Sequence, residues 1–189
     1  MKIEALQLRK GNIIEYQGGL WRVLKTEHTK PGKGGAFVQT ELKNIETGTK
    51  TNNRFRSEEK VEKAHIEPRK MEFLYHDGAN YIFMDQGTFD QIGLDEETLE
   101  GVTDFLQPNL EVDVLFHNDR PIGLELPKAV ELKVVEAEAV VTGQTADSSY
   151  KPAKVETGVT VMVPQFIEAG DVIRVNPAEG TYEDRVRQG

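Results

Sequence analysis

Short runs of alternating apolar and polar residues dominate the chain. The runs hold β-branched and aromatic residues and are broken by Gly, Pro, Asn or Asp, as in NIIEY before QGG. Alternation with a period of two, interrupted by turn residues at this spacing, predicts an all-β protein of small sandwiches or barrels. Only residues 95–105, DEETLEGVTDF, predict a short helix, because acidic residues lie near its start.

Two breaks divide this pattern into three β-modules. One break is the HIEPR turn at residues 65–69, and the other is Pro127, after which a new strand-like run begins. FLQPNLEVDV from Phe105 and FIEAGDVIRV from Phe166 align at an offset of 61 residues, which indicates an internal repeat. Each module has about 60 residues, near the lower size at which a core is stable alone. The predicted domains are 1–64, 65–128 and 129–189.

Composition narrows the class of protein. Cysteine is absent, which excludes a disulfide framework, a thiol nucleophile and a cysteine-based metal site, and which fits a reducing cytoplasm. The start, MKIEALQLRKGN, lacks the apolar region of a signal peptide, and no apolar run approaches the length that spans a bilayer. The sequence therefore predicts a cytoplasmic protein with no membrane partner.

Charge is distributed unevenly along the chain. The net charge is −9, yet residues 1–63 contain 13 Lys and Arg against 8 Asp and Glu. Residues 64–128 contain 4 against 14, and residues 129–189 contain 6 against 10. The asymmetry indicates that the first module contacts a polyanion, or else that the acidic modules confer solubility.

The stretch HTKPGKGGAF, residues 28–37, is the strongest candidate for function. Pro31 fixes its own φ, and Gly32, Gly34 and Gly35 permit positive φ around Lys33, so residues 30–35 are predicted to form a hairpin tip. A phosphate-binding loop is excluded, because Lys33 is followed by Gly34 and a strand rather than by Ser or Thr and a helix. The lysine is either a projecting functional group or an ordinary solvated turn residue.

Eight segments in fixed order carry a family resemblance over essentially the whole chain. They are KPGKGGAF from Lys30, LKNIETGTK from Leu42, FLYHDG from Phe73, YIFMDQGTFDQI from Tyr81, VELKV from Val130, YKPAKVETGVTVMVP from Tyr150, FIEAGDVIRV from Phe166 and GTYEDR from Gly180. The chain in this way resembles bacterial translation elongation factor P. The resemblance implies an SH3-like (translation-protein) barrel followed by two OB-like barrels, in an L-shaped arrangement similar to the outline of tRNA.

The same resemblance implies an activity and its partners. Proteins of this type bind the ribosome, contacting both subunits, between the peptidyl and exit sites, and they rescue synthesis stalled at consecutive prolines. The residue matching Lys33 is usually lengthened by a lysine-modifying enzyme, and it reaches toward the acceptor end of the peptidyl-site tRNA. The implied protein is a cytoplasmic monomer, not an enzyme, and uses no cofactor. The implied tip loop around the lysine comprises Lys30, Pro31, Gly32, Gly34 and Gly35.

Four residues, one of them already named in the tip loop, are candidates for contacts to RNA. Lys30 and Arg22, near the tip or on its supporting strand, either bind phosphates or are solvated strand charges. Tyr182 and Arg185 match a C-terminal Tyr-x-x-Arg that the family associates with contacts to tRNA or the small subunit. The alternative for this pair is a half-buried strand tyrosine and a surface arginine.

A loop in the third module matches a family motif with one departure. Gly143, Gln144 and Thr145 occupy the place of a Gly-Asp-Thr loop associated with the exit-site mRNA codon. Gln144 replaces the aspartate, so a contact that needs a carboxylate is in doubt, although an amide still donates and accepts hydrogen bonds.

Other functions fit the sequence less well. The four histidines are scattered, and neither a H-E-x-x-H nor a G-x-S-x-G motif occurs. A general OB-fold RNA-binding protein needs a basic groove, whereas the second and third modules are acidic. An elongation-factor-P-like paralogue usually lacks the tip lysine, so the intact KPGKG disfavours it.

Overall fold

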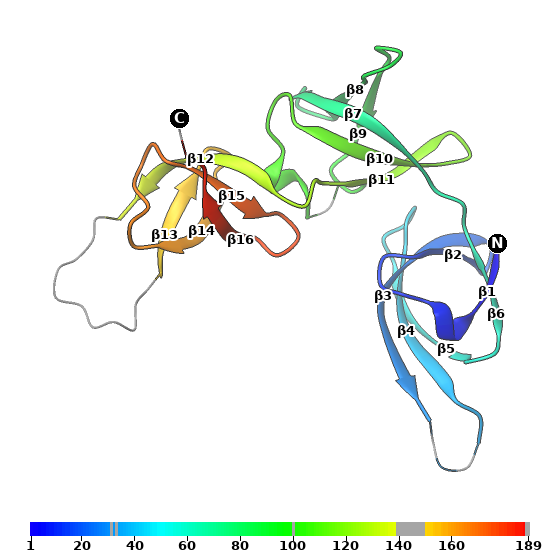
Figure 1. Ribbon diagram of the computed structural model, residues 1–189. Helices are drawn as coiled ribbons and strands as arrows, with labels where there is room; N and C mark the ends of the chain where they lie inside the picture. The colour runs from blue at the N-terminus through cyan, green and yellow to red at the C-terminus, as the bar shows by residue number, and fades with distance from the viewer. Residues whose placement is uncertain (31, 33, 100, 139–149, 188–189) are drawn as a thin grey trace. The chain divides into compact units, whose positions relative to one another are not determined.

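The computed structural model describes residues 1–30, 32, 34–99, 101–138 and 150–187. This part of the chain forms sixteen β-strands in three separate sheets, with two short 3-10 helices and no α-helix (Figure 1). The predicted all-β class is therefore confirmed. Among the described residues, no helix has the length and apolar character needed to cross a membrane.

The first sheet has six strands in the order β1-β6-β2-β3-β4-β5. Its core is built from apolar residues that alternate with exposed ones, and it contains Trp21, whose indole Nε1 donates to the Tyr16 carbonyl at 2.9 Å. The 3-10 helix η1 (Ala5–Gln7) follows the edge strand β1, and Leu6 N donates to the carbonyl of Ser57, directly after the other edge strand β5, at 3.1 Å, so η1 connects the two ends of the sheet. The strands are β1 (Lys2–Glu4), β2 (Ile13–Tyr16), β3 (Gly19–Thr29), β4 (Phe37–Asn44), β5 (Lys50–Arg56) and β6 (Lys60–Lys63).

The second sheet has five strands in the order β11-β10-β7-β8-β9. Phe73 and Phe83 are buried on its inner face with ring centroids 5.3 Å apart. Its strands are β7 (Glu67–His76), β8 (Tyr81–Asp85), β9 (Gln91–Leu94), β10 (Glu111–His117) and β11 (Arg120–Glu125).

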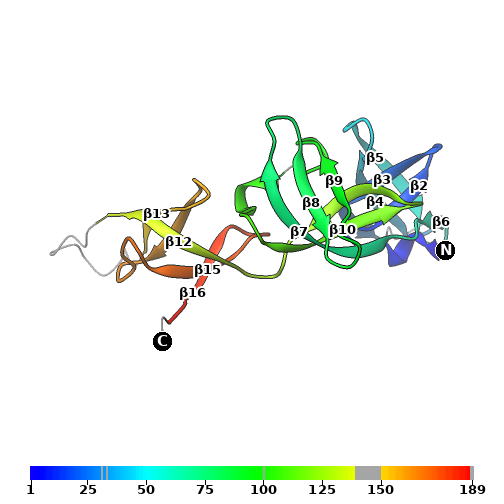
Figure 2. The same ribbon diagram turned by 90° about the horizontal axis from the view of Figure 1, so that it is seen from above.

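The third sheet has the order β14-β13-β12-β15-β16, and Figure 2 shows β12, β13, β15 and β16 of this sheet. Alternation is most regular here: YKPAKV in β13 places Lys151, Ala153 and Val155 inside and the residues between them outside. Lys151 is buried through its apolar stem, and its Nζ donates to the Glu138 carbonyl at 2.6 Å. The strands are β12 (Val130–Ala137), β13 (Tyr150–Val155), β14 (Thr160–Pro164), β15 (Val172–Asn176) and β16 (Thr181–Arg185).

The second and third sheets have the same topology. Matching β7 through β11 with β12 through β16 in chain order gives the same strand order in both sheets. β10 begins at Glu111 and β15 at Val172, which is the offset of 61 residues found in the sequence. The predicted internal repeat is therefore confirmed.

The predicted helix over residues 95–105 is wrong. The described residues of this stretch form turns, followed by the 3-10 helix η2 (Thr103–Phe105). Gly101 has φ +83°, a value outside the α-helical region, which stops a helix from continuing through it. The Asp95 carboxylate accepts hydrogen bonds from both the backbone N–H and the hydroxyl of Thr98, so it caps a turn.

The chain folds into two compact units. The first comprises residues 1–68 together with 115–122, and the second comprises 69–114 together with 123–189. In the first unit, Leu115 and Ile122 are buried with Ile13 and Ala64. The domain limits suggested by the sequence, near residues 64 and 128, stay a prediction, as does the L-shaped arrangement.

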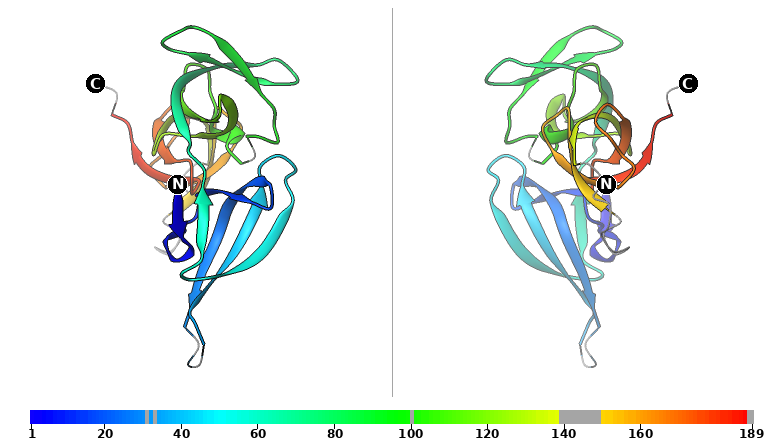
Figure 3. Two further views of the ribbon diagram at one scale, coloured as in Figure 1. Left: turned by 90° about the vertical axis from the view of Figure 1, so that its right-hand side faces the viewer. Right: turned by 90° about the vertical axis from the view of Figure 1, so that its left-hand side faces the viewer.

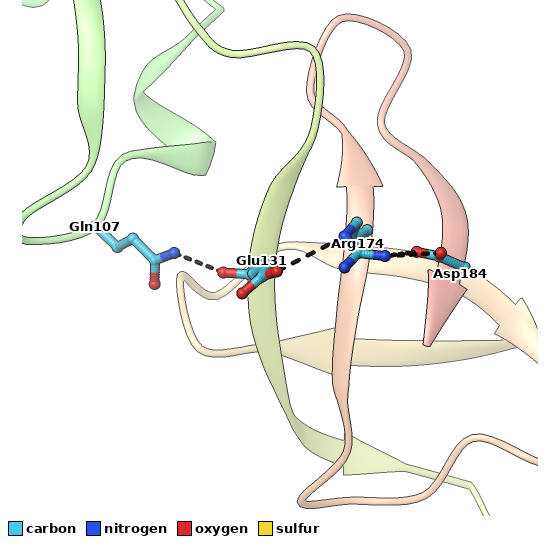
Figure 4. A network of polar contacts seen from close by, with 4 residues as sticks. All are labelled: Gln107, Glu131, Arg174 and Asp184. Carbon is cyan, nitrogen blue, oxygen red and sulfur yellow. Dashed lines mark hydrogen bonds and ion pairs between the residues drawn. The ribbon is translucent and has the colours of Figure 1, made fainter. Parts of the chain in front are cut away.

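Segments before β10 contribute to the core of the third sheet, within the second unit. Phe105 of η2 is 5% exposed and belongs to the same cluster as Val130 and Ile173. Polar contacts join the same segments: Gln107 Nε2 donates to the Glu131 carbonyl at 2.6 Å, and Arg174 pairs with the carboxylates of Glu131 and Asp184 (Figure 4). Because Phe105 is buried among residues of β12 and β15, this core depends on residues that precede β10 in sequence.

Candidate functional site

A long hairpin of β3 and β4 extends from the first barrel (Figure 1; Figure 3). The two strands pair from Trp21↔Asn44 to Thr29↔Phe37, with an irregularity between Val23 and Lys25. Beyond that irregularity most β3 residues are exposed, so the outer part of the hairpin is held by backbone pairing to β4. The two strands that the sequence predicted on either side of the tip are therefore present.

The described tip residues leave open space around them. Lys30, Gly32, Gly34 and Gly35 are exposed, and Gly34 has φ +126°, which strongly favours glycine. A Cβ added at any of these three glycines would meet no atom within 4 Å in the described part of the chain. Lys33 and Pro31, the other two tip residues singled out from the sequence, lie outside the described residues.

Two arginines of β5 lie opposite the outer end of β4. Arg56 pairs with Phe37, and Arg54 pairs with Gln39. The guanidinium of Arg54 lies 4.2 Å from the centroid of the Phe37 ring, a cation–π contact that holds the side chain along the hairpin. Both arginines are exposed, so together with Lys30 they place positive charge at the free end of the hairpin.

Sequence analysis did not identify these two arginines. The signal was the alternation in NNRFR, where the buried Phe55 separates Arg54 from Arg56 and puts both on the outer face. What the sequence did not show was the register, which places the end of β5 beside the start of β4.

The other cations of β3 contribute less to the charge at the tip. Arg22 pairs with Lys43 and lies seven residues before the end of β3, about 23 Å away at the usual strand rise. Lys25 pairs with Glu27 at 2.8 Å, and this hydrogen bond raises the pKa of Lys25 and lowers the pKa of Glu27. The positive charge of Lys25 is therefore balanced by the carboxylate of Glu27. Of Arg22, Lys25 and Lys30, only Lys30 lies at the tip.

The C-terminal pair from the sequence lies on the third sheet. Tyr182 is half-buried against the core, and burial raises its pKa, with a smaller contribution from the nearby Asp184 carboxylate. Arg185 lies 3.9 Å from an oxygen of Asp171, and its guanidinium lies 5.1 Å from the ring centroid of the exposed Phe166. Gly143, Gln144 and Thr145, the predicted codon loop, lie outside the described residues.

The second compact unit also contains a cavity. An open cavity of about 370 Å³ is lined by Gln107, Leu110, Glu131 and Arg174, among others. Within the described residues, no three His, Asp or Glu side chains are grouped so that they could hold a metal ion. The projecting hairpin of β3 and β4, with Lys30, Arg54 and Arg56 exposed near its outer end, is therefore the candidate site.

Three domains of one protein family match the chain, one for each of the three sheets. Residues 4–61 match the elongation factor P KOW-like domain, residues 66–124 match the elongation factor P OB domain, and residues 130–185 match the elongation factor P C-terminal domain. A KOW-like barrel with a long basic hairpin, followed by an OB barrel and a third of the same topology, defines a multi-barrel protein of the translation-factor class. The chain belongs to the elongation factor P family, and it is a translation elongation factor.

Relatives that are similar over almost the whole chain belong to the same family. Elongation factor P of Acidithiobacillus ferrooxidans is 61% identical over 185 residues, which cover 98% of this chain and all of the relative. Elongation factor P of Nitrosospira multiformis is 51% identical over 98% of this chain and 99% of its own. The solved structure of eukaryotic translation initiation factor 5A from Methanococcus jannaschii has a TM-score of 0.50 at 24% identity. It covers 67% of this chain and 94% of its own, and shows the fold alone.

Proposed function

We propose that this elongation factor binds the ribosome between the peptidyl and exit sites and stimulates peptide-bond formation at consecutive prolines. Lys33, lengthened by a lysine-modifying enzyme, is the group that reaches the acceptor end of the peptidyl-site tRNA. The observation that carries this proposal is the hairpin of β3 and β4, which extends from the barrel and has Lys30, Arg54 and Arg56 exposed at its outer end. The protein works in the cytoplasm as a monomer.

The physical role is positioning. Proline reacts poorly because its ring constrains φ and removes the amide hydrogen, so the reacting ends rarely align. A side chain that steadies the tRNA acceptor end reduces the entropic part of the barrier without taking part in the chemistry. The ribosome then performs the reaction, and this protein supplies position and positive charge.

The exposed cations have a separate role in this proposal. Lys30, Arg54 and Arg56 neutralise RNA phosphates and fix the hairpin beside the tRNA. Tyr182 and Arg185 contact tRNA or the small subunit from the third barrel, and Gly143, Gln144 and Thr145 lie near the exit-site codon. If these assignments are right, replacing any of these contact residues should weaken ribosome binding.

Removing the two β5 arginines is expected to weaken ribosome binding in a salt-dependent manner. In Arg54→Gln/Arg56→Gln, each lost phosphate contact should reduce the slope of log affinity against log salt by about one. The measurement is ribosome binding by the labelled protein across a salt series. Lys60→Gln is the matched control, because Lys60 is an exposed cation of the same barrel that pairs with Glu4 on β1. Equal slopes for the double variant and the control would contradict the phosphate assignment.

A further inference from the structure

The β4 side of the hairpin is held in place almost as far as the tip. Val38 and Phe55 lie opposite each other on β4 and β5, and both are buried in the core of the first barrel. Beyond the end of β5, the backbone N–H of Ser57 donates to the Ala36 carbonyl at 3.0 Å, and Ser57 is itself buried. The pairing therefore continues to Ala36, the residue directly after Gly35 of the tip.

The β3 side is held less firmly over the same length. Along residues 25–29, β3 pairs with β4 alone among the described strands, because β2 pairs only with residues 19–22 of β3. Glu27, His28 and Thr29 at the end of β3 are all exposed. The direction in which the hairpin projects is therefore set from β4 and β5.

One aromatic ring links β4 and β5 on the outer face of the hairpin. Phe37, the first residue of β4, is half-buried, and the Arg54 guanidinium lies 4.2 Å from its ring centroid. Arg54 pairs with Gln39 in the register, so its side chain reaches Phe37 diagonally across the sheet. Arg54 Nε also donates to Gln39 Oε1 at 3.4 Å. The contact thus joins two rows of side chains next to the tip.

The contact with Arg54 favours a role for the ring within the hairpin over a role in stacking on RNA. A platform for a nucleobase needs a ring face that is open to the base. The Phe37 ring already has the Arg54 guanidinium over it. A guanidinium that lies over a ring keeps its N–H donors at its edge, so Arg54 remains able to bind a phosphate.

We propose that Phe37 is a positioning residue, which holds the hairpin in one direction by keeping the Arg54 guanidinium against β4. This inference rests on the proposed function, because the direction of the hairpin matters only if the hairpin carries the group that reaches the tRNA. A misplacement of about 1 Å in a group that aligns reactants lowers a rate by up to about 100-fold. Affinity for the ribosome depends instead on the exposed cations, which a change at position 37 leaves in place.

The first test measures proline–proline bond formation over a series of factor concentrations. Phe37→Leu keeps an apolar side chain and removes the aromatic ring. Its maximal rate should fall about two- to fivefold, the factor that corresponds to the loss of an exposed cation–π contact. The concentration that gives half of the maximal rate should stay within about twofold of the parent, since Lys30, Arg54 and Arg56 remain.

Two conservative variants separate positioning from charge. Phe37→Tyr keeps the ring and should restore the rate of the parent. Arg54→Lys keeps the positive charge but loses the planar guanidinium, so its maximal rate should fall while the salt dependence of ribosome binding stays unchanged. If Phe37→Leu instead needs a higher concentration and reaches the parent's maximal rate, the ring contacts RNA and the inference is wrong.

Hydrogen exchange of the free protein tests the same contact without the ribosome. In Phe37→Leu, the Ser57 N–H that bonds Ala36 should exchange about two- to fivefold faster, because the end of the paired segment opens more often. The control is the Ala64 N–H, which donates to the Ile13 carbonyl at 2.9 Å in the first unit and should not change. Unchanged exchange at Ser57, or equal acceleration at Ser57 and Ala64, would contradict the positioning role.

The modification of Lys33 is measured in the same preparations by mass spectrometry. Rates are compared per molecule that carries the added mass, or per molecule of protein if the parent carries none. A loss of rate in Phe37→Leu that disappears after this correction would mean that the ring serves the modifying enzyme, and would overturn the inference. Equal stimulation by the parent and Phe37→Leu would remove this inference alone. Failure of the parent to stimulate would remove the proposed function and this inference together.

Discussion

Replacing Lys33 with alanine is expected to leave the protein folded and to abolish its stimulation of polyproline synthesis. A side chain in a surface turn usually contributes less than about 0.5 kcal/mol to stability, so the melting temperature should not change measurably. Positioning of the tRNA acceptor end would be lost, and this is the step through which the protein is proposed to act. The measurement is the rate of proline–proline bond formation in a reconstituted translation system.

Lys33→Arg provides the matched control for charge. It keeps the positive charge but lacks the amine that a lysine-modifying enzyme needs, so protein purified from its own host should be inactive as well. Ribosome binding by both variants should fall only in part, because Lys30, Arg54 and Arg56 remain. Mass spectrometry of the native protein should show added mass on Lys33. Stimulation by both variants at the level of the parent would mean that the tip is an ordinary solvated turn.

Phe105→Ala is expected to destabilise the second compact unit by about 3–5 kcal/mol, the range for removing a buried aromatic side chain. Phe105 is 5% exposed and packs in the core of the third sheet with residues of β12 and β15. Urea unfolding followed by circular dichroism should therefore show a lower midpoint. The fluorescence transition of Trp21, the one tryptophan of the chain, should shift less, because Trp21 lies in the core of the first barrel.

Phe166→Ala is the control for this measurement. Phe166 aligns with Phe105 in the internal repeat, but its side chain is 55% exposed. Its loss removes the contact with the Arg185 guanidinium, worth about 0.5–1 kcal/mol at an exposed site, and leaves the buried core of the third sheet in place. Similar midpoints for the two variants would show that Phe105 does not contribute to the core as described.

The local alternation of apolar and polar residues was sufficient to predict most of the strands. Alternation in VELKV and YKPAKV places every second side chain in the core, and the structure has strands at both positions. The same reasoning failed for residues 95–105, where acidic residues at the start suggested a helix. Gly101 adopts a positive φ there, and glycine in a sequence does not reveal which conformation it adopts.

The candidate site was only partly visible in the sequence. Glycines around a lysine indicate an open turn, and that pattern identified the hairpin and its position. Arg54 and Arg56 were missed because their place beside the hairpin depends on the pairing of β5 with β4, a register between segments some 15 residues apart.

The sequence by itself determined the all-β class, the internal repeat and the lysine-bearing hairpin, since each depends on residues that are close together or on a fixed offset. Only the tertiary structure decided how equivalent residues are used. Phe105 and Phe166 occupy the same place in the repeat, yet one is buried in a core and the other lies on the surface. The reason is that Phe105 meets the third sheet, which follows it in the chain, and burial depends on such long-range contacts rather than on the local sequence.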